Sequence, residues 1–206
     1  MSGTTHRFAL IDYGAGNITS VAKGFAAAGA ELVTAASPAD LDRFSGIVIP
    51  GVGHFGAASS LSAAWRQAIA RRVTAGVPLL GICLGMQLLF EGSDEAADVP
   101  GLALLAGRCT LMTAARPLKI PHVGWNALQP VRRTPLLDDV PAGAQVYFTH
   151  SFAAPVTPDT AATAQHGGAF AAVVQREHIG GVQFHPEKSG DLGIRILRNF
   201  VRMTRG

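Results

Sequence analysis

The chain has 206 residues, of which 48% are hydrophobic and 15% charged, and its formal net charge is +3. This length suits one domain of ordinary size, so we expect residues 1–206 to form a single domain with its own core. The composition excludes disordered and fibrous proteins. Lys and Arg are scattered, and the densest basic spots are the pairs Arg71-Arg72 and Arg132-Arg133. A nucleic-acid surface needs a basic stripe with interleaved aromatics, so we expect no nucleic-acid partner.

The two cysteines, Cys83 and Cys109, imply no disulfide framework, and neither has the spacing of a zinc ligand. The amino-terminal residues lack the apolar stretch of a signal peptide. The longest uncharged apolar run, residues 77–90, contains Pro and Gly and is shorter than the ~18 residues that suggest a membrane span. We therefore expect a cytoplasmic protein that contacts no membrane.

In the first half, short apolar runs alternate with amphipathic stretches. Strands are expected at Phe8–Asp12, Glu31–Thr34, Gly46–Ile49 and Val77–Ile82. Helices are expected at Ile18–Ala28, closed by Gly29, at Leu61–Ala75, closed by Gly76, and from Leu84 to Phe90. Strands that alternate with helices predict a parallel α/β sheet.

From Gly107 onward the runs are shorter and rich in β-formers. Strands are expected at Gln145–Phe148, Ala169–Val174 and Ile179–Phe184, with a turn at Gln175–His178 between the last two. A final helix is expected at Asp191–Met203, with Ile194, Leu197 and Val201 on one face. The whole pattern predicts an α/β fold with a mixed sheet flanked by helices, and a small β-rich portion in its second half.

The segment Gly81-Ile82-Cys83-Leu84-Gly85 is the cysteine form of the G-x-S-x-G elbow, in which a strand runs directly into a helix. The flanking glycines are needed because a Cβ there would collide with neighbouring backbone. The helix amino terminus favours the thiolate, which is the attacking form. An isolated cysteine is more often a buried structural residue, and we expect that role for Cys109. The elbow makes Cys83 the candidate nucleophile.

His185-Pro186-Glu187 follows an apolar strand, so alternation predicts that His185 and Glu187 face the same way. The carboxylate can then hold one ring nitrogen while the other faces a nucleophile. Alone, this tripeptide equally fits a helix cap or a surface histidine. A metal site needs a third close ligand beside His and Glu, which the sequence does not supply.

The remaining histidines fall into two groups. His6, His166 and His178 lie near the terminus or in polar turns, and we expect them at the surface. The other three lie in glycine-rich or polar contexts that are unusual for histidine, and they are His54, His122 and His150.

Acyl transfer also needs donors for the oxygen that becomes negative. Pro50-Gly51-Val52-Gly53 follows the third strand, at the carboxyl edge where α/β sites assemble. A plain tight turn explains this segment equally well in the absence of the other motifs.

Together PGVGHFG, GICLGMQLL, KIPHVGWN, YFTHSF and GVQFHPEKS resemble the glutaminase subunits of imidazole glycerol phosphate synthase, a family of class I (triad) glutamine amidotransferases. The matches run in order from Asp12 to Ser189. The elbow and His-Pro-Glu are typical of the superfamily, whereas DYGAGN, PGVG and IPHVGWN are more specific. Val123 stands where Met is frequent, and Phe152, where Tyr is frequent, removes a hydroxyl from the pocket rim.

The resemblance implies a flavodoxin-like fold and a role for each matching position. Cys83 attacks the glutamine amide, His185 moves the proton and Glu187 orients His185. The N–H of Val52, in either a preformed or a reoriented loop, and the N–H of Leu84 form the oxyanion hole. The positions that hold L-glutamine are Gly53, Gln87, Glu95, His150, Ser151 and Phe152, of which Glu95 faces the α-ammonium group. The positions near the partner interface and the ammonia passage are Asn17, His122, Trp125, Asn126 and Lys188.

The implied partner is a (β/α)8-barrel cyclase subunit in a heterodimer, which uses the ammonia in histidine biosynthesis; no cofactor or metal is implied. Two other functions fit parts of the sequence. A free-standing cysteine hydrolase acting on γ-glutamyl compounds needs no docking surface, and Trp125 then packs in the core. A non-catalytic scaffold keeps the fold but has no reason to retain Cys83, His185 and Glu187 together.

Overall fold

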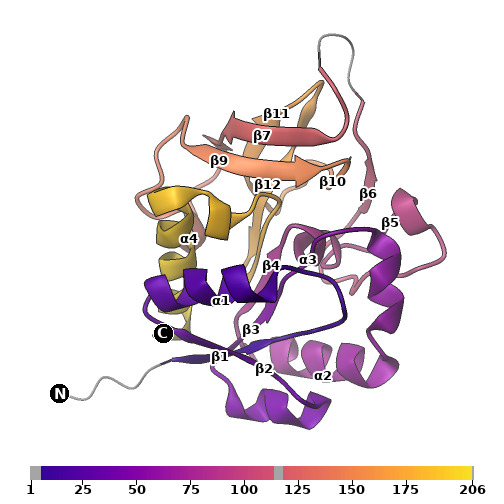
Figure 1. Cartoon of the computed structure of the whole chain (residues 1–206), viewed down its shortest axis with the longest axis vertical. Coiled ribbons are helices and arrows are strands. Elements are labelled where there is room, and N and C mark those ends of the chain that lie inside the picture. The colour runs from indigo at the N-terminus through magenta and orange to yellow at the C-terminus, as the bar shows by residue number, and fades with distance from the viewer. Residues whose placement is uncertain (1–5, 114–117, 206) are drawn as a thin grey trace.

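A sheet of mixed strand direction forms the centre of the protein (Figure 1), in a computed structural model that describes residues 6–113 and 118–205. Within those residues the sheet has eight strands, in the spatial order β2 (Glu31–Thr34), β1 (Arg7–Leu10), β3 (Gly46–Ile49), β4 (Leu79–Ile82), β13 (Ile179–Val182), β12 (Ala169–Arg176), β11 (Thr160–Gln165) and β8 (Gln129–Pro130). The strands from β2 to β13 pair in parallel, and β12, β11 and β8 continue the sheet antiparallel. The predicted α/β fold with a mixed sheet is confirmed.

Two smaller sheets lie beside the β12–β11 end of the central sheet, in the upper half of Figure 1, and form the expected β-rich portion. In the first, β6 (Arg108–Leu111) pairs with β10 (Phe152–Ala153) and β5 (Gly92–Ser93). In the second, β7 (His122–Ala127) pairs antiparallel with β9 (Gln145–His150).

Helices cover both faces of the central sheet. Their bounds are α1 (Ile18–Ala27), α2 (Ala63–Thr74), α3 (Leu84–Gln87) and α4 (Gly190–Arg202). Helices α1 and α4 lie side by side on one face, α2 covers the other, and α3 is a single turn directly after β4 (Figure 1). Short 3-10 turns connect these elements, at Pro38–Arg43, Phe55–Ser60, Asp94–Ala96, Pro135–Leu137, Pro186–Lys188 and Met203–Arg205.

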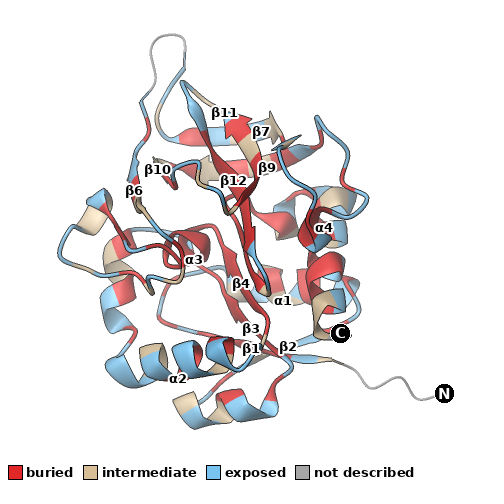
Figure 2. Cartoon of the chain, turned by 180° about the vertical axis from the view of Figure 1, so that it is seen from behind, coloured by how far each residue is buried: buried red, intermediate tan, exposed pale blue. Residues whose placement is uncertain are grey.

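Alternate side chains of the buried strands divide the core between the two faces. On β3, Val48 packs with the residues of α1 and α4, whereas Ile47 and Ile49 pack on the α2 side. On the first face the rings of Phe8, Phe25 and Phe200 lie 5.4–6.3 Å apart and join β1, α1 and α4. Figure 2 shows the central strands buried and the outer face of α2 exposed. This is why the central strands read as continuous apolar runs.

Several predicted boundaries are shifted by local hydrogen bonding. The second helix begins at Ala63, because the hydroxyl of Ser62 caps it. The helix expected from Leu84 to Phe90 ends at Gln87. The expected turn at Gln175–His178 is narrower, since β12 continues to Arg176 and Glu177 takes a left-handed φ of 52°.

The close packing of β4 and α3 against β3 depends on two glycines. A Cβ on Gly85 would collide with the carbonyl oxygen of Ile49, and a Cβ on Gly81 would lie 2.5 Å from the carbonyl oxygen of Gly85. Both obstacles are backbone atoms, so neither can rotate out of the way.

Among the helices in the described ranges, none is long and apolar enough to cross a membrane.

We expect Gly85→Ala to lower the free energy of unfolding by about 3 kcal/mol, the upper end of the usual cost of overpacking. Gly168→Ala is the matched control, because a Cβ there meets nothing within 4 Å and its φ is not left-handed; a change within about 0.5 kcal/mol is expected for it. Urea denaturation measures both. Equal effects of the two substitutions would contradict the packing argument.

Candidate active site

Cys83 lies at the junction of β4 and α3 in a strained backbone conformation. Its φ is 54° and its ψ is −110°, which residues with a side chain rarely adopt. Its N–H donates to the carbonyl of Val182 at 2.8 Å, which keeps the junction attached to β13. The side chain is 5% exposed. The elbow predicted from the glycine spacing is therefore present, although α3 is only one turn long and its dipole is correspondingly small.

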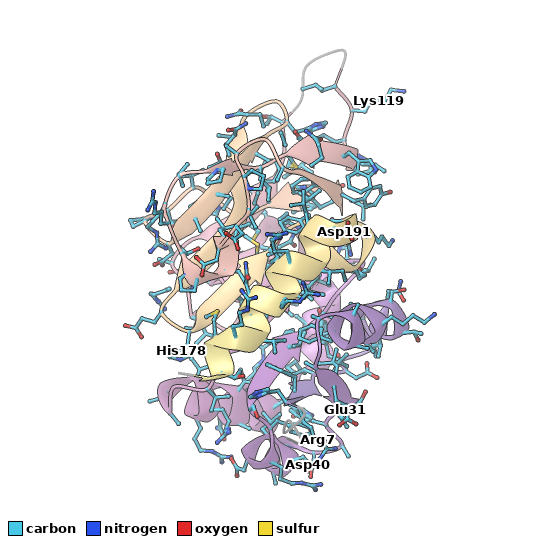
Figure 3. All side chains as sticks on the ribbon, turned by 90° about the vertical axis from the view of Figure 1, so that its left-hand side faces the viewer. Arg7, Glu31, Asp40, Lys119, His178 and Asp191 are labelled. Carbon is cyan, nitrogen blue, oxygen red and sulfur yellow. The ribbon has the colours of Figure 1, made fainter. Side chains whose placement is uncertain are left out.

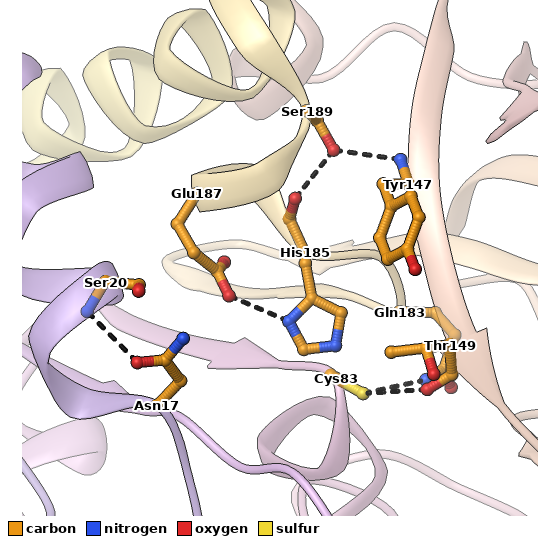
Figure 4. Close-up of polar contacts among 9 residues, drawn as sticks. All are labelled: Asn17, Ser20, Cys83, Tyr147, Thr149, Gln183, His185, Glu187 and Ser189. Atoms are coloured by element: carbon orange, nitrogen blue, oxygen red, sulfur yellow. Dashed lines mark hydrogen bonds and ion pairs between the residues drawn. The ribbon is translucent and has the colours of Figure 1, made fainter. Parts of the chain in front are cut away.

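His185 and Glu187 form a buried pair beside this sulfur (Figure 4). Nδ1 of His185 donates to Oε1 of Glu187 at 2.8 Å, and both side chains are 1% exposed. Strand alternation is the wrong reason for this pairing, because β13 ends at Val182 and the 3-10 turn Pro186–Lys188 brings the two side chains together.

The backbone of His185 is fixed by β9 and by one hydroxyl. Its N–H donates to the carbonyl of Tyr147 at 2.9 Å. The hydroxyl of Ser189 donates to the carbonyl of His185 at 2.6 Å and accepts from the N–H of Tyr147 at 3.0 Å. Tyr147 and Ser189 lie within the quoted segments YFTHSF and GVQFHPEKS, but neither was assigned a role, because both act through hydrogen bonds to backbone groups.

The second ring nitrogen of His185, Nε2, is buried, makes no hydrogen bond to the described part of the chain, and lies on the side of Cys83 (Figure 4). Burial alone would lower the pKa of His185, but interactions with Cys83 and then Glu187 outweigh burial and raise the pKa to about 9. The raised pKa favours the protonated ring, which is the form that can donate a proton to a leaving amine.

The Pro50–Gly53 loop does not present the expected pair of donors. The N–H of Leu84 donates to the carbonyl oxygen of Gly51 at 3.3 Å. That carbonyl and the N–H of Val52 belong to one trans peptide and point in opposite directions. The N–H of Val52 therefore points away from Leu84, and the predicted oxyanion hole of Val52 and Leu84 is closed in this structure.

A cavity of about 40 Å³ adjoins Cys83, and every residue predicted to hold the substrate lines it. These six are Gly53, Gln87, Glu95, His150, Ser151 and Phe152. Thr149 also lines it and was missed, although it lies within the quoted segment YFTHSF, because no role was assigned to that position. The volume is far below the roughly 300–1,000 Å³ of typical ligand pockets, so an amino acid needs the pocket to open. Larger hollows, such as the one of about 560 Å³ along residues 130–140, contain none of these residues.

Two polar side chains of the pocket already have partners. Oε2 of Glu95 accepts from the N–H of Phe55 at 2.7 Å, which leaves Oε1 for a substrate. Nε2 of Gln87 donates to the carbonyl of Phe152 at 2.8 Å and to Oε1 of Gln183 at 3.2 Å. Gln183 was not predicted; its signal is a polar residue in an otherwise apolar buried segment two positions before His185.

The residues expected near a partner are divided between a surface and the interior. Trp125 is 57% exposed on β7, so core packing of this residue is excluded. Its ring lies 6.0 Å from that of Tyr147, over which Nζ of Lys188 lies at 5.8 Å. Asn17 is exposed and caps α1, with its amide nitrogen pointing toward Glu187 in Figure 4.

His122 and Asn126 instead point inward from β7. His122 is 4% exposed, and its Nδ1 lies 3.1 Å from Nε2 of His150. His166, expected at the surface, is half-buried and stacks on His122 with ring centroids 4.2 Å apart. That expectation was wrong because the stacking partner lies far away in sequence.

Three other predictions concern isolated side chains. Burial raises the pKa of the Cys109 thiol to about 12, so this cysteine is a neutral core residue. His54 is exposed and accepts from the N–H of Gly56, which begins the turn Phe55–Ser60. His178, also expected at the surface, is half-buried, with its Nε2 2.8 Å from the carbonyl oxygen of Val73, so that expectation was wrong too. Among the residues that the structure describes, no three His, Cys, Asp or Glu side chains converge as metal ligands.

The raised pKa of His185 makes stability depend on pH. Since about 9 lies above the ordinary value of 6.5, the protonated ring stabilises the fold fully below about pH 6.5, and this stabilisation is lost as pH rises through about 9. We expect Glu187→Gln to lower the pKa of His185 and flatten this decline, measured by chemical denaturation from pH 6 to 9.5. Glu177→Gln is the control: that carboxylate faces His178 at 4.0 Å but is 83% exposed. A parallel decline in Glu187→Gln and the wild type would contradict the assignment.

The chain matches the family model of class I glutamine amidotransferases over residues 9–203. Imidazole glycerol phosphate synthase subunit HisH of Xylella fastidiosa (strain 9a5c) is 45% identical, over 95% of this chain and 96% of the relative. The HisH proteins of Xanthomonas euvesicatoria pv. vesicatoria (strain 85-10) and Gloeobacter violaceus (strain ATCC 29082 / PCC 7421) are each 46% identical, over 95% and 96% of this chain and 97% and 89% of theirs.

Solved structures share the fold at low sequence identity. The structure of PurLQS from Thermotoga maritima has a TM-score of 0.77 and 19% identity, covering 97% of this chain and 99% of that one. The crystal structure of a glutamine amidotransferase has a TM-score of 0.75 and 15% identity, covering 96% of this chain and 99% of that one. With the family model and the curated relatives, the chain belongs to the class I glutamine amidotransferases, in the HisH family of imidazole glycerol phosphate synthase subunits.

Proposed function

We propose that this chain hydrolyses L-glutamine to glutamate and ammonia and passes the ammonia to a cyclase subunit of imidazole glycerol phosphate synthase, in the cytoplasm. The observation that carries the proposal is the buried pair of His185 and Glu187 beside Cys83, next to the pocket lined by the six expected substrate residues. The names of the relatives, which share 45–46% of their residues with this chain, support the same activity and partner.

In the proposed reaction the sulfur of Cys83 attacks the amide carbon of glutamine. The amide oxygen becomes an oxyanion, and protonated His185 gives its proton to the departing nitrogen, so that ammonia leaves and a thioester remains. Neutral His185 then takes a proton from water, whose oxygen attacks the thioester to release glutamate and restore the thiolate. Glu187 keeps the ring oriented and stabilises its positive charge.

The proposal requires the Pro50–Gly53 loop to change conformation. The oxyanion needs the N–H groups of both Val52 and Leu84, and the carbonyl of Gly51 now occupies the second. Rotation of the Gly51–Val52 peptide releases Leu84 and turns the N–H of Val52 inward. In the opened pocket, Oε1 of Glu95 receives the α-ammonium group of glutamine. The closed loop therefore favours slow hydrolysis by the chain alone.

The proposed docking face for the cyclase is the outer side of the β7–β9 sheet. Val123 and Trp125 are each 57% exposed there, and Lys188 adds a positive charge beside Tyr147. An exposed tryptophan flanked by a second aromatic ring is typical of interface centres. The cyclase, a (β/α)8 barrel, would combine the ammonia with its ribulosyl phosphate substrate to give imidazole glycerol phosphate and aminoimidazole carboxamide ribotide.

We expect Cys83→Ala to abolish glutamine hydrolysis in the complex while the cyclase still works with added ammonium salt. The matched control is Cys109→Ala, which should retain glutamine turnover because that thiol is buried and does not line the pocket. An electrophilic glutamine analogue should label Cys83 in the wild type, as read by peptide mass spectrometry. Normal turnover in Cys83→Ala, or labelling found at Cys109 alone, would overturn the catalytic assignment.

We expect Trp125→Ala to weaken binding of the cyclase by at least about tenfold, as loss of a central aromatic anchor does. Val131→Ala is the control, because Val131 is also 57% exposed but follows β8 at the edge of the central sheet. Calorimetric titration measures both affinities. Full glutaminase activity of the chain alone, unchanged by the cyclase, would instead support a free-standing hydrolase.

A further inference from the structure

Two buried histidines lie between the proposed docking face and the glutamine pocket. His122 on β7 and His150 on β9 are directly opposite in the antiparallel pair and point inward together. The ring of His122 is stacked between those of His166 and Phe148, at centroid distances of 4.2 and 4.8 Å. The catalytic steps proposed above use neither His122 nor His166.

The protonation of this pair follows from its partners at the pocket end. Nδ1 of His150 lies 3.0 Å from the carbonyl oxygen of Phe152. A carbonyl only accepts, so Nδ1 carries the hydrogen, and Nε2 of the neutral ring is an acceptor. Nδ1 of His122, 3.1 Å from that Nε2, must therefore be the donor, which leaves Nε2 of His122 as an acceptor.

At the other end of this series of hydrogen bonds, Asn126 independently shows the same donor-to-acceptor direction. The amide nitrogen of Asn126 donates to the carbonyl of Gln165 at 2.8 Å, and its oxygen accepts from the N–H of Ala127 at 2.8 Å. The orientation of the amide is thus fixed by backbone groups. Its nitrogen lies 3.2 Å from Nε2 of His122 and donates to it. Every donor from Asn126 to Phe152 therefore points toward the pocket.

Both rings must be neutral for this arrangement to hold. A proton on Nε2 of His150 would face the hydrogen on Nδ1 of His122, and reversing His122 would pass the conflict to the fixed amide of Asn126. Burial lowers the pKa of His150 to about 3 and that of His122 to about 4. The titratable groups that act on the pair are His166 and, for His150, also His185; each opposes protonation when charged.

The carbonyl of Phe152 continues the connection into the pocket. It accepts from His150 and also from Nε2 of Gln87, and the same nitrogen of Gln87 lies 3.2 Å from Oε1 of Gln183. Nε2 of Gln183 lies 3.7 Å from the sulfur of Cys83. Because His150 and Gln87 share the carbonyl of Phe152 as acceptor, the orientation of each side chain depends on the other. Rotation of one of them would leave another buried polar group without a hydrogen bond.

We propose that Asn126, His122 and His150 form a positioning relay that holds the Phe152 carbonyl and the Gln87 amide in the geometry that receives glutamine. Because the outward side chains of β7 lie on the proposed docking face, the relay gives contacts on that face a hydrogen-bonded connection to the pocket. The identity of the substrate in this inference rests on the glutaminase function proposed above. The direction of the hydrogen bonds does not depend on that function.

The first test measures the polarity directly in the full-length chain. Long-range ¹H–¹⁵N spectra of histidine-labelled protein should show His122 and His150 both protonated at Nδ1 only, with no titration from pH 6 to 9. His122→Phe and His150→Asn assign the two sets of signals by their loss. Protonation at Nε2, or titration of either ring near its ordinary value of 6.5, would overturn the relay.

The second test separates positioning from general damage with two alkylating reagents, read at Cys83. His122→Phe keeps the stacked ring but removes the donor to His150. We expect an electrophilic glutamine analogue, which needs the pocket, to react about tenfold more slowly with this variant, the usual effect of one buried hydrogen bond. Iodoacetamide, which needs only the sulfur, should react within about twofold of the wild-type rate. Equal slowing with both reagents, or no slowing with either, would contradict the relay.

His178→Phe is the control for a histidine-to-phenylalanine change outside the relay; His178 is half-buried, and its Nε2 lies 2.8 Å from the carbonyl oxygen of Val73. In Figure 3 His178 is well separated from Lys119. Lys119 marks the neighbourhood of the relay, because its carbonyl oxygen lies 2.8 Å from Nε2 of His166, whose ring stacks on His122. His178→Phe should react like the wild type with both reagents.

Adding Asn126→Ala to His122→Phe should slow the reaction with the analogue less than Asn126→Ala does in the wild type, since both substitutions act on one relay. Additive effects of the two substitutions would overturn the coupling. Failure of the analogue to label the wild type would refute the proposed function instead.

Discussion

The candidate site depends on one contact, the approach of Gly85 to the carbonyl of Ile49 at the carboxyl ends of two neighbouring strands. Because the backbones touch there, the turn after β4 is too tight for an ordinary φ, and Cys83 occupies the left-handed conformation. The same contact brings Gly51, two residues after Ile49, against the N–H of Leu84. The proposed nucleophile and the proposed oxyanion loop are therefore positioned by a single backbone contact, which side chains elsewhere only support.

The sequence predicts the parts of the site that are encoded within a few residues. The glycine spacing at Gly81–Gly85 gives the elbow, and the resemblance gives the residues that line the pocket. The sequence does not predict contacts between distant segments, such as the stacking of His166 on His122. The length of α3 was missed because apolar patterning does not distinguish one helical turn from two. The tight turn at His185 was missed because strand alternation was extended past the end of β13. The orientation of the Gly51–Val52 peptide cannot be predicted from the types of the residues in this loop.

Strand β7 serves two surfaces through its period of two residues. Its outward side chains, Val123 and Trp125, are exposed, whereas the inward His122 is enclosed between other rings. A shift in the β7–β9 register by one residue would exchange these sets and bury the tryptophan in place of the histidine. Pairing of His122 with His150 across the strands therefore fixes both the external face and the internal hydrogen bonds.

The hydrogen bond from Leu84 to Gly51 has a consequence for how this chain can change by mutation. One peptide group carries both the oxygen that accepts from the N–H of Leu84 and the nitrogen that the proposed oxyanion hole needs. A side-chain substitution can bias the loop toward one orientation, but it cannot delete the obstruction and leave the donor in place. The inactive and the proposed active state are thus two orientations of the Gly51–Val52 peptide group. Selection can change only the equilibrium between these two orientations.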